Sequence, residues 1–198
     1  MMKIETIYHY LLYSALQEKR FSFTQQELAK SFDYSLSTIS HALKIPEELG
    51  AIKKTSKFFV LQDFKKLLYY WATVRRFKKD IIYQTYIDAP VVEIEGLVPA
   101  GTIYACYSAG RRILEDAPAD YAKVYFYFDK EKVEIVKNRF PEVNNREANL
   151  FVIAKSFDMD KYGLITTIPQ TFVDIWGLSD WYGRDFILAL EEKIDGLL

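Results

Sequence analysis

The sequence of 198 residues predicts an α+β protein, in which an N-terminal helical segment with a basic hairpin precedes an α/β domain with a mixed sheet. Two patterns predict this fold class. Apolar residues in the first fifty positions repeat at helical spacing, whereas short β-prone runs alternate with helical patterns beyond Pro90. Half of the residues are hydrophobic and 16% are aromatic, so the chain can bury a packed core.

The first two helices are predicted from residue spacing and from capping. Apolar residues between Ile4 and Leu16 recur every three or four positions, so residues 3–18 should form an amphipathic helix. Thr24 can cap a second helix, because its hydroxyl accepts a hydrogen bond from the amide three residues later. In such a capping box, Glu27 would reach back to the Thr24 amide.

A third helix is expected to begin after Ser35, its predicted N-cap. Leu36, Ile39, Ala42 and Leu43 should face the core. The remaining side carries short polar or cationic residues that can approach base edges and phosphates: Ser37, Thr38, Ser40, His41 and Lys44. Pro46 lacks an amide donor and clashes with the carbonyl four residues earlier, which predicts a break near Lys44 and Ile45. Gly50 suits the C-terminal cap.

A β-hairpin is predicted after Gly50, where two short β-prone segments flank a polar tip. Lys53, Lys54 and Lys57 would lie along a phosphate backbone, and each contact would add salt-dependent affinity. Residues 1–80 hold 14 basic and 8 acidic side chains, whereas residues 81–198 hold 12 and 19. The hairpin therefore belongs to the basic part of the chain, which favours a nucleic-acid partner.

This order of capped helix, turn, helix and hairpin resembles the winged helix-turn-helix transcriptional regulators. The resemblance is carried by Glu27-Leu28-Ala29, by residues 35–43 and by Leu49-Gly50-Ala51-Ile52. It implies a DNA-binding domain over residues 1–63 and a sequence-specific transcriptional regulator that binds double-stranded DNA. Regulators of this kind usually bind two half-sites as dimers, so a homodimer is expected. The expected DNA-binding residues are Ser35, Ser37, Thr38, Ser40, His41, Lys44, Lys53, Lys54 and Lys57.

Residues 62–86 carry apolar residues at helical spacing, and residues 64–88 are therefore assigned to a helical linker or interface helix. Residues 89–198 would form the α/β domain, with a regulatory or interaction role. Residues 141–147 (PEVNNRE) should form a loop. The expected β-like runs are residues 91–95, 123–128, 133–136, 150–154 and 164–168, and the helical patterns are residues 103–114, 170–175 and 181–194.

Two segments of this domain carry a second resemblance. Ala105 to Arg112 in a helix, followed by Tyr125-Phe126-Tyr127 in a strand, looks like the opening of a nucleotidyltransferase-like fold. That family holds its metal on two alternating strand carboxylates, which this strand lacks, so an active transferase is not expected. Ile165 to Trp176 is similar to a segment of antitoxin-type regulators from abortive-infection systems, which join a winged helix to a non-catalytic domain of related fold.

The antitoxin resemblance implies an alternative function. The chain would then bind a partner toxin through its acidic C-terminal domain and autoregulate its own operon. A nucleotidyl-transferring enzyme is a third possibility, disfavoured by the missing strand carboxylates.

The sequence offers no constellation for catalysis or metal binding. Two distant histidines and the single Cys106 support neither a zinc site nor a Cys-His pair, and no phosphate-binding glycine motif is present. We therefore expect no enzymatic activity, no cofactor and no metal. The start of the chain lacks the layout of a signal peptide, and no apolar run approaches the ~20 residues of a membrane span. A cytoplasmic protein without membrane association is expected.

Overall fold

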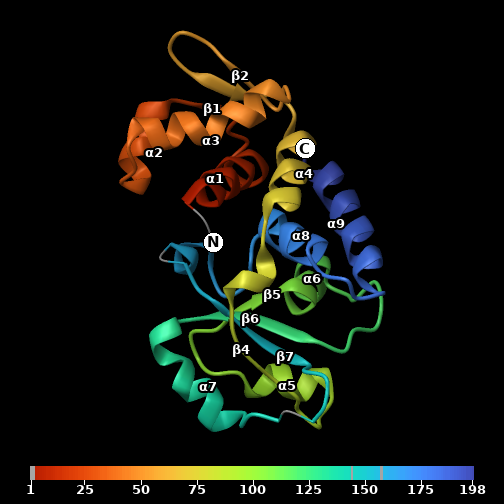
Figure 1. Ribbon diagram of the computed structural model, residues 1–198. Coiled ribbons are helices and arrows are strands. Elements are labelled where there is room, and N and C mark those ends of the chain that lie inside the picture. The colour runs from red at the N-terminus through yellow and green to blue at the C-terminus, as the bar shows by residue number, and fades with distance from the viewer. Residues whose placement is uncertain (1–2, 144, 157) are drawn as a thin grey trace. The chain divides into compact units, whose positions relative to one another are not determined.

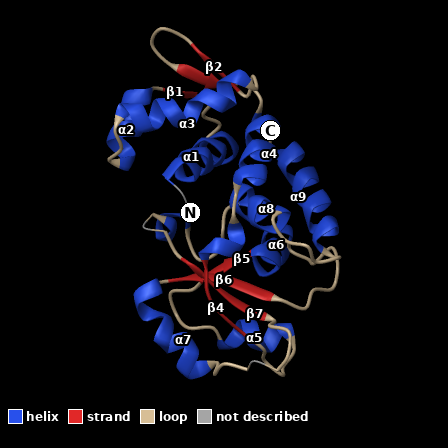
Figure 2. Ribbon diagram, in the orientation of Figure 1, coloured by secondary structure: helices blue, strands red, loops and turns tan. Residues whose placement is uncertain are grey.

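The computed structural model describes residues 3–143, 145–156 and 158–198 (Figure 1). Contacts divide the chain into two compact units, one of residues 1–75 with 194–198 and one of residues 76–193. The fold is α+β, with a small antiparallel sheet in the first unit and a four-stranded mixed sheet in the second (Figure 2). No helix in the described ranges has the length and apolar character that crossing a bilayer requires.

The described residues of the first unit form four helices, the end of a fifth helix and three short strands. Its sheet has the order β1-β3-β2, and both pairs are antiparallel. Helix α1 packs against α3 and α4, and fully buried Leu11, Leu43 and Trp71 lie in this core. The elements are α1 (Lys3–Gln17), β1 (Ser22–Phe23), α2 (Gln25–Phe32), α3 (Leu36–Glu48), β2 (Ile52–Lys54), β3 (Phe59–Leu61) and α4 (Phe64–Val74).

The expected caps position α2 and α3. The Thr24 hydroxyl accepts a hydrogen bond from the Glu27 amide at 3.1 Å, which confirms this N-cap. The Glu27 carboxylate contacts Arg20, in place of the return bond to Thr24 that the sequence suggested. Asp33 ends α2 with a left-handed backbone (φ +52°), a conformation that Asp tolerates better than most residues. Ser35 then caps α3 by accepting from the Thr38 amide at 3.1 Å.

Helix α3 continues through Pro46 to Glu48, so the expected break near Lys44 and Ile45 is wrong. Pro46 has no amide to donate to the Ala42 carbonyl, but the Tyr8 hydroxyl of α1 donates to this oxygen at 2.8 Å. Because the carbonyl is satisfied and Pro46 itself is buried, the helix tolerates the proline. Gly50 follows the helix with a φ of +71°, which confirms it as the terminating glycine.

The second unit is built on the four-stranded sheet, in the order β4-β7-β6-β5. Strands β6 and β7 are parallel, and both edge strands are antiparallel to their neighbours, so the expected mixed sheet is present. The elements are η1 (Phe77–Asp80), β4 (Ile81–Thr85), α5 (Val91–Leu97), β5 (Ile103–Ala105), α6 (Cys106–Leu114), β6 (Val124–Phe128), η2 (Lys130–Lys132), α7 (Val133–Arg139), β7 (Leu150–Ala154), η3 (Met159–Tyr162), α8 (Ile168–Trp176) and α9 (Gly183–Leu197).

Each face of this sheet is covered by its own helices (Figure 1). Helices α5 and α7 lie on one side, and α6 and α8 on the other. Side chains alternate along a strand, so Phe126 and Val152 join the core on the α5–α7 side, whereas Tyr125 and Phe151 point the opposite way. The core on the α5–α7 side consists of Tyr83, Ile94, Val124, Phe126, Phe128, Val136, Phe140, Leu150 and Val152.

Several expected elements differ in type from those observed. The runs 91–95 and 133–136 were expected as strands but lie in helices α5 and α7. The start of the helical pattern 103–114 is strand β5, and the run 164–168 contributes only an isolated bridge before α8 begins. The expected strands over 123–128 and 150–154 are confirmed as β6 and β7.

The long helix expected over residues 62–86 is also wrong. Helix α4 ends at Val74, because Arg75 is extended, and the later residues form η1 and β4. The contact boundary at residues 75 and 76 therefore falls within the expected linker of residues 64–88. The described part of the expected loop at 141–147 contains no helix or strand, and Asn144 lies outside the described residues.

Candidate nucleic-acid interface

Four of the residues expected to contact DNA form one exposed stripe along α3. Ser37, Ser40, His41 and Lys44 are all exposed and follow the i, i+3, i+4, i+7 spacing of a single helix face. The opposite face is buried through Ile39, Ala42, Leu43 and Pro46. The core therefore fixes the rotation of α3 and directs the polar stripe outward.

The other two candidates on this helix, Ser35 and Thr38, are engaged with each other. Their hydroxyl oxygens lie 2.9 Å apart and share a hydrogen bond, in addition to the bond from the Thr38 amide to Ser35. Thr38 is only partly exposed. Both residues thus start the helix and position the stripe, while their hydroxyls already have partners.

The stripe ends in an acidic residue that was not among the expected DNA contacts. Glu48 is exposed and lies four residues after Lys44, on the same side of α3. Leu36, which was expected to face the core, is 50% exposed at the other end of the helix. The helical spacing alone could have identified Glu48, since it continues the series that begins at Ser37.

The three hairpin lysines have different surroundings. Lys53 and Lys57 are exposed, and neither side chain forms an ion pair with any residue in the described ranges. Lys54 is half-buried and pairs with Glu47 of α3 at 2.5 Å. Strand residues alternate between faces, so Lys53 shares the outer face of the small sheet with its partner Val60. Only Lys53 and Lys57 therefore carry charge that no neighbour neutralises.

The tip of the hairpin is held by Thr55. Its hydroxyl accepts from the Phe58 amide at 3.1 Å and donates to the Phe58 carbonyl at 2.7 Å. The tip and the start of α2 border a groove of about 390 Å³, lined by Gln25, Gln26 and Lys57 among others. Amides at a helix N-terminus and a nearby lysine both suit a phosphate group.

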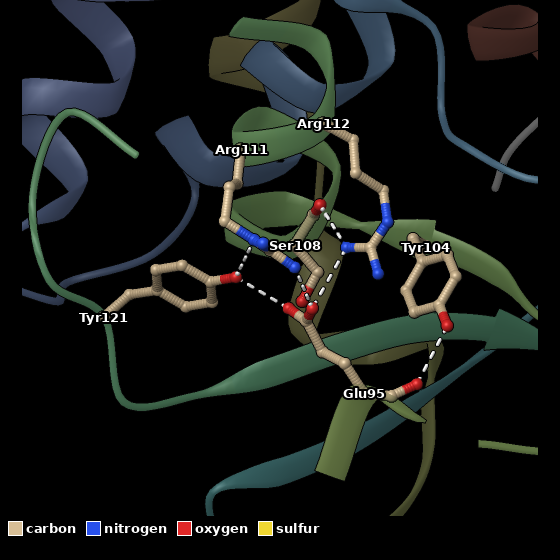
Figure 3. A network of polar contacts seen from close by, with 6 residues as sticks. All are labelled: Glu95, Tyr104, Ser108, Arg111, Arg112 and Tyr121. Atoms are coloured by element: carbon tan, nitrogen blue, oxygen red, sulfur yellow. Dashed lines mark hydrogen bonds and ion pairs between the residues drawn. The ribbon is translucent and has the colours of Figure 1, made fainter. Parts of the chain in front are cut away.

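A network of charges in the second unit involves the helix that resembles the nucleotidyltransferase opening. The carboxylate of Glu95 on α5 is 2% exposed and receives three donors (Figure 3). Arg111 and the Tyr121 hydroxyl each donate at 2.6 Å, and Arg112 lies 3.2 Å away. Arg112 also stacks on the Tyr104 ring, with 3.7 Å between its Cζ atom and the ring centre.

This network joins α5 to α6 and leaves the carboxylate fully engaged. Burial would raise the pKa of Glu95, but Ser108, Tyr121, Arg112 and Arg111 together lower it below its ordinary value. Glu95 therefore stays ionised and paired, which is the state of a structural group rather than of a general acid.

The strand that would carry metal-binding acids in a transferase is closed off. Every residue of β6 is buried, and the strand contains no carboxylate. Tyr127 of this strand instead donates a hydrogen bond to Asp174 of α8 at 2.6 Å. Among the described residues, no group of three or more His, Cys, Asp or Glu side chains could hold a metal ion.

Comparisons with known proteins give no relative for this chain: no protein-family model, curated protein or solved structure matches it.

Proposed function

We propose that the chain is a sequence-specific DNA-binding transcriptional regulator whose first unit acts as a winged helix-turn-helix. The observation that carries this proposal is the stripe on α3. Its side chains are short, polar or cationic, and a buried opposite face holds them outward. A helix of this kind can enter the major groove, where hydroxyls and an imidazole reach base edges.

The hairpin supplies the contacts to the phosphate backbone in this proposal. Lys53 and Lys57 carry unneutralised charge, and Thr55 fixes the tip that presents Lys57. Lys54 contributes less, because Glu47 already pairs with it. Base contacts from α3 give specificity, whereas the lysines give affinity that depends on salt.

Binding across a salt series tests this division of roles. DNA selected by the chain from random fragments serves as the probe. Lys53→Gln and Lys57→Gln should each weaken binding several-fold and reduce the slope of log affinity against log salt by about 1. Lys54→Gln is the matched control in the same hairpin and should change the slope less. Unchanged slopes for the Lys53 and Lys57 variants would rule out this placement of DNA.

Substitutions on the stripe should behave differently from those in the hairpin. Ser37→Ala and His41→Ala would remove base contacts and leave the phosphate contacts in place. The order of preferred DNA sequences should therefore change, while the slope of log affinity against log salt stays constant. A repeated fragment selection with each variant measures this.

A second candidate function is an antitoxin-type protein that binds a partner toxin. It is favoured by exposed apolar side chains in the second unit, Trp181 at 78% and Leu164 at 65%, which suit a protein partner. This unit is also acidic, with 19 acidic and 15 basic residues, so a basic partner fits best. The gene that neighbours the gene of this chain can be co-expressed with it. Copurification of the two proteins would favour this function over DNA regulation alone.

A further inference from the structure

The second unit contains a cavity that neither proposed function uses. It has a volume of about 630 Å³ and lies over the sheet face that carries Tyr125 and Phe151. Strand β4, the start of β6 and β7, and residues 178–180 between α8 and α9 form its walls. Small-molecule sites commonly have volumes of roughly 300–1,000 Å³, so this cavity has the size of a ligand site.

One wall of the cavity is aromatic and aliphatic. The rings of Tyr125 and Phe151 stack with their centres 4.6 Å apart and an angle of 11° between their planes. Phe151 is only partly buried, and the partly buried Ile81 and Ile82 also line the cavity. A planar apolar group entering the cavity would cover this exposed part of the wall.

The hydroxyl of Tyr125 is an unused polar group in the same cavity. The side chain is 3% exposed, yet its hydroxyl makes no hydrogen bond with any residue that the structure describes. The hydroxyl oxygen is not fully enclosed by protein atoms, so it is open to the cavity. The cavity therefore presents a donor and acceptor position that a ligand could fill.

Two lysines bring positive charge to the cavity. Lys78 is exposed and forms no ion pair within the described ranges. Lys123 is hydrogen-bonded to Asp180 at 2.8 Å and to Glu147 at 2.9 Å. Asp180 is 11% exposed and is also held by the Tyr107 hydroxyl, whereas Glu147 is 83% exposed. Glu147 is thus the anion that an incoming ligand can replace.

We propose that this cavity binds a planar aromatic carboxylate. The ring packs against Phe151 and Ile81, and the carboxylate takes the place of Glu147 on Lys123 while Lys78 approaches from the rim. With Glu147 displaced, two lysines and Asp180 leave a net charge of +1. That charge matches one carboxylate better than a doubly charged phosphate.

The site can be tested by NMR titration of the full chain with indole-3-acetate, with indole as the ring alone and with acetate as the carboxylate alone. At ordinary ligand efficiency, indole-3-acetate should bind with a dissociation constant of about 1 mM or below. Indole and acetate should each bind at least about tenfold more weakly, since each lacks one of the two interactions. Absence of binding by indole-3-acetate at several times this concentration overturns the proposal.

Variants then locate the binding. Lys78→Gln and Tyr125→Phe should each weaken indole-3-acetate several-fold, whereas Glu147→Gln should strengthen it because the competing carboxylate is gone. Lys79→Gln is the matched control, since Lys79 adjoins Lys78 on η1 but does not line the cavity. Equal binding by the Lys78, Tyr125 and Lys79 variants would place the ligand elsewhere and overturn the proposal. Because no DNA is involved, the outcome is independent of the proposed regulator function.

Discussion

At the scale of single residues, the Tyr8 hydroxyl shows how one distant side chain decides a local structure. A proline in a helix normally leaves the carbonyl four residues earlier without its donor. Here that carbonyl belongs to Ala42, and Tyr8 supplies the donor from α1, thirty-four positions earlier in the chain. The hydrogen bond also joins α1 to α3, so it helps to hold the helix that carries the polar stripe.

Tyr8→Phe should therefore destabilise the chain by about 1–2 kcal/mol, because it leaves the Ala42 carbonyl buried without a donor. Urea denaturation measures this loss. In a Pro46→Ala background the new amide can donate to Ala42, so Tyr8→Phe should cost less than half as much there. Equal costs in both backgrounds would show that Tyr8 does not compensate for the proline.

Glu95 is a second residue whose effect can be separated from its surroundings. Glu95→Gln removes the charge that Arg111 and Arg112 share, and should cost about 1–2 kcal/mol at neutral pH. The cost stays below that of a fully buried pair, because these arginines are 36% and 25% exposed. Glu93→Gln, at an exposed position on the same helix, is the control and should have little effect.

The dependence on pH gives a further readout for Glu95. Its pKa in the folded chain is lowered from the ordinary 4.5, so its stabilisation is complete above that value and is lost as the pH falls through the lowered pKa. Denaturation at neutral and at acidic pH measures the free energy of unfolding of the wild type and of Glu95→Gln. The difference between the two should be smaller at acidic pH. A constant difference would mean that the carboxylate charge is not what stabilises the network.

At the scale of elements, α3 combines attractive and repulsive groups on one face. Glu48 ends the same stripe as Lys44, and a carboxylate there would repel phosphates. In the proposed regulator, Glu48→Gln should therefore raise DNA affinity about two- to tenfold without changing the preferred sequence. Glu18→Gln, the same change just after α1, should leave affinity unchanged in the same binding assay. A loss of affinity or of sequence preference in Glu48→Gln would instead indicate that Glu48 contacts a base.

In the first unit, the helix caps and the terminating glycine were predictable because their signals are local. The hydroxyls of Thr24 and Ser35 cap helices by accepting hydrogen bonds from amides three residues later. Gly50 ends a helix through its positive φ. The exposed stripe follows from helical spacing alone. In contrast, neither the Tyr8 contact with Ala42 nor the ion pair of Lys54 with Glu47 has a signal in the local sequence.

In the second unit, the sequence patterns predicted the wrong type for several short elements. Helices α5 and α7 have seven residues each, and their valines and isoleucines favour strands in isolation. Such short helices depend on tertiary packing, here of Ile94 and Val136 in the core of the sheet. Likewise, Phe77 continues the apolar spacing of α4, but its ring contacts Tyr125 of the second unit. The spacing could not reveal that the chain changes units at this point.

At the scale of the whole molecule, the charge division is weaker than the sequence suggested. Divided after residue 80, the two parts carry net charges of +6 and −7. Divided into the observed units, the first holds 11 basic and 8 acidic residues, and the second 15 and 19. The net charges become +3 and −4. A DNA-binding function therefore depends more on the arrangement of Ser37, His41, Lys53 and Lys57 than on bulk charge.

This modest charge leads to a prediction about assembly. A single first unit offers one short helix, α3, and few unneutralised lysines, so one copy should bind specific DNA weakly. Two copies related by a two-fold axis would double these contacts, and their recognition helices would lie about one helical turn of DNA apart, roughly 34 Å. Fragment selection at fixed salt should then enrich a palindrome, and ultracentrifugation with that DNA should show two chains per site. Enrichment of a single half-site bound by one chain would exclude the two-fold arrangement. The placement of α3 in the major groove would then still be tested by the substitutions on the stripe.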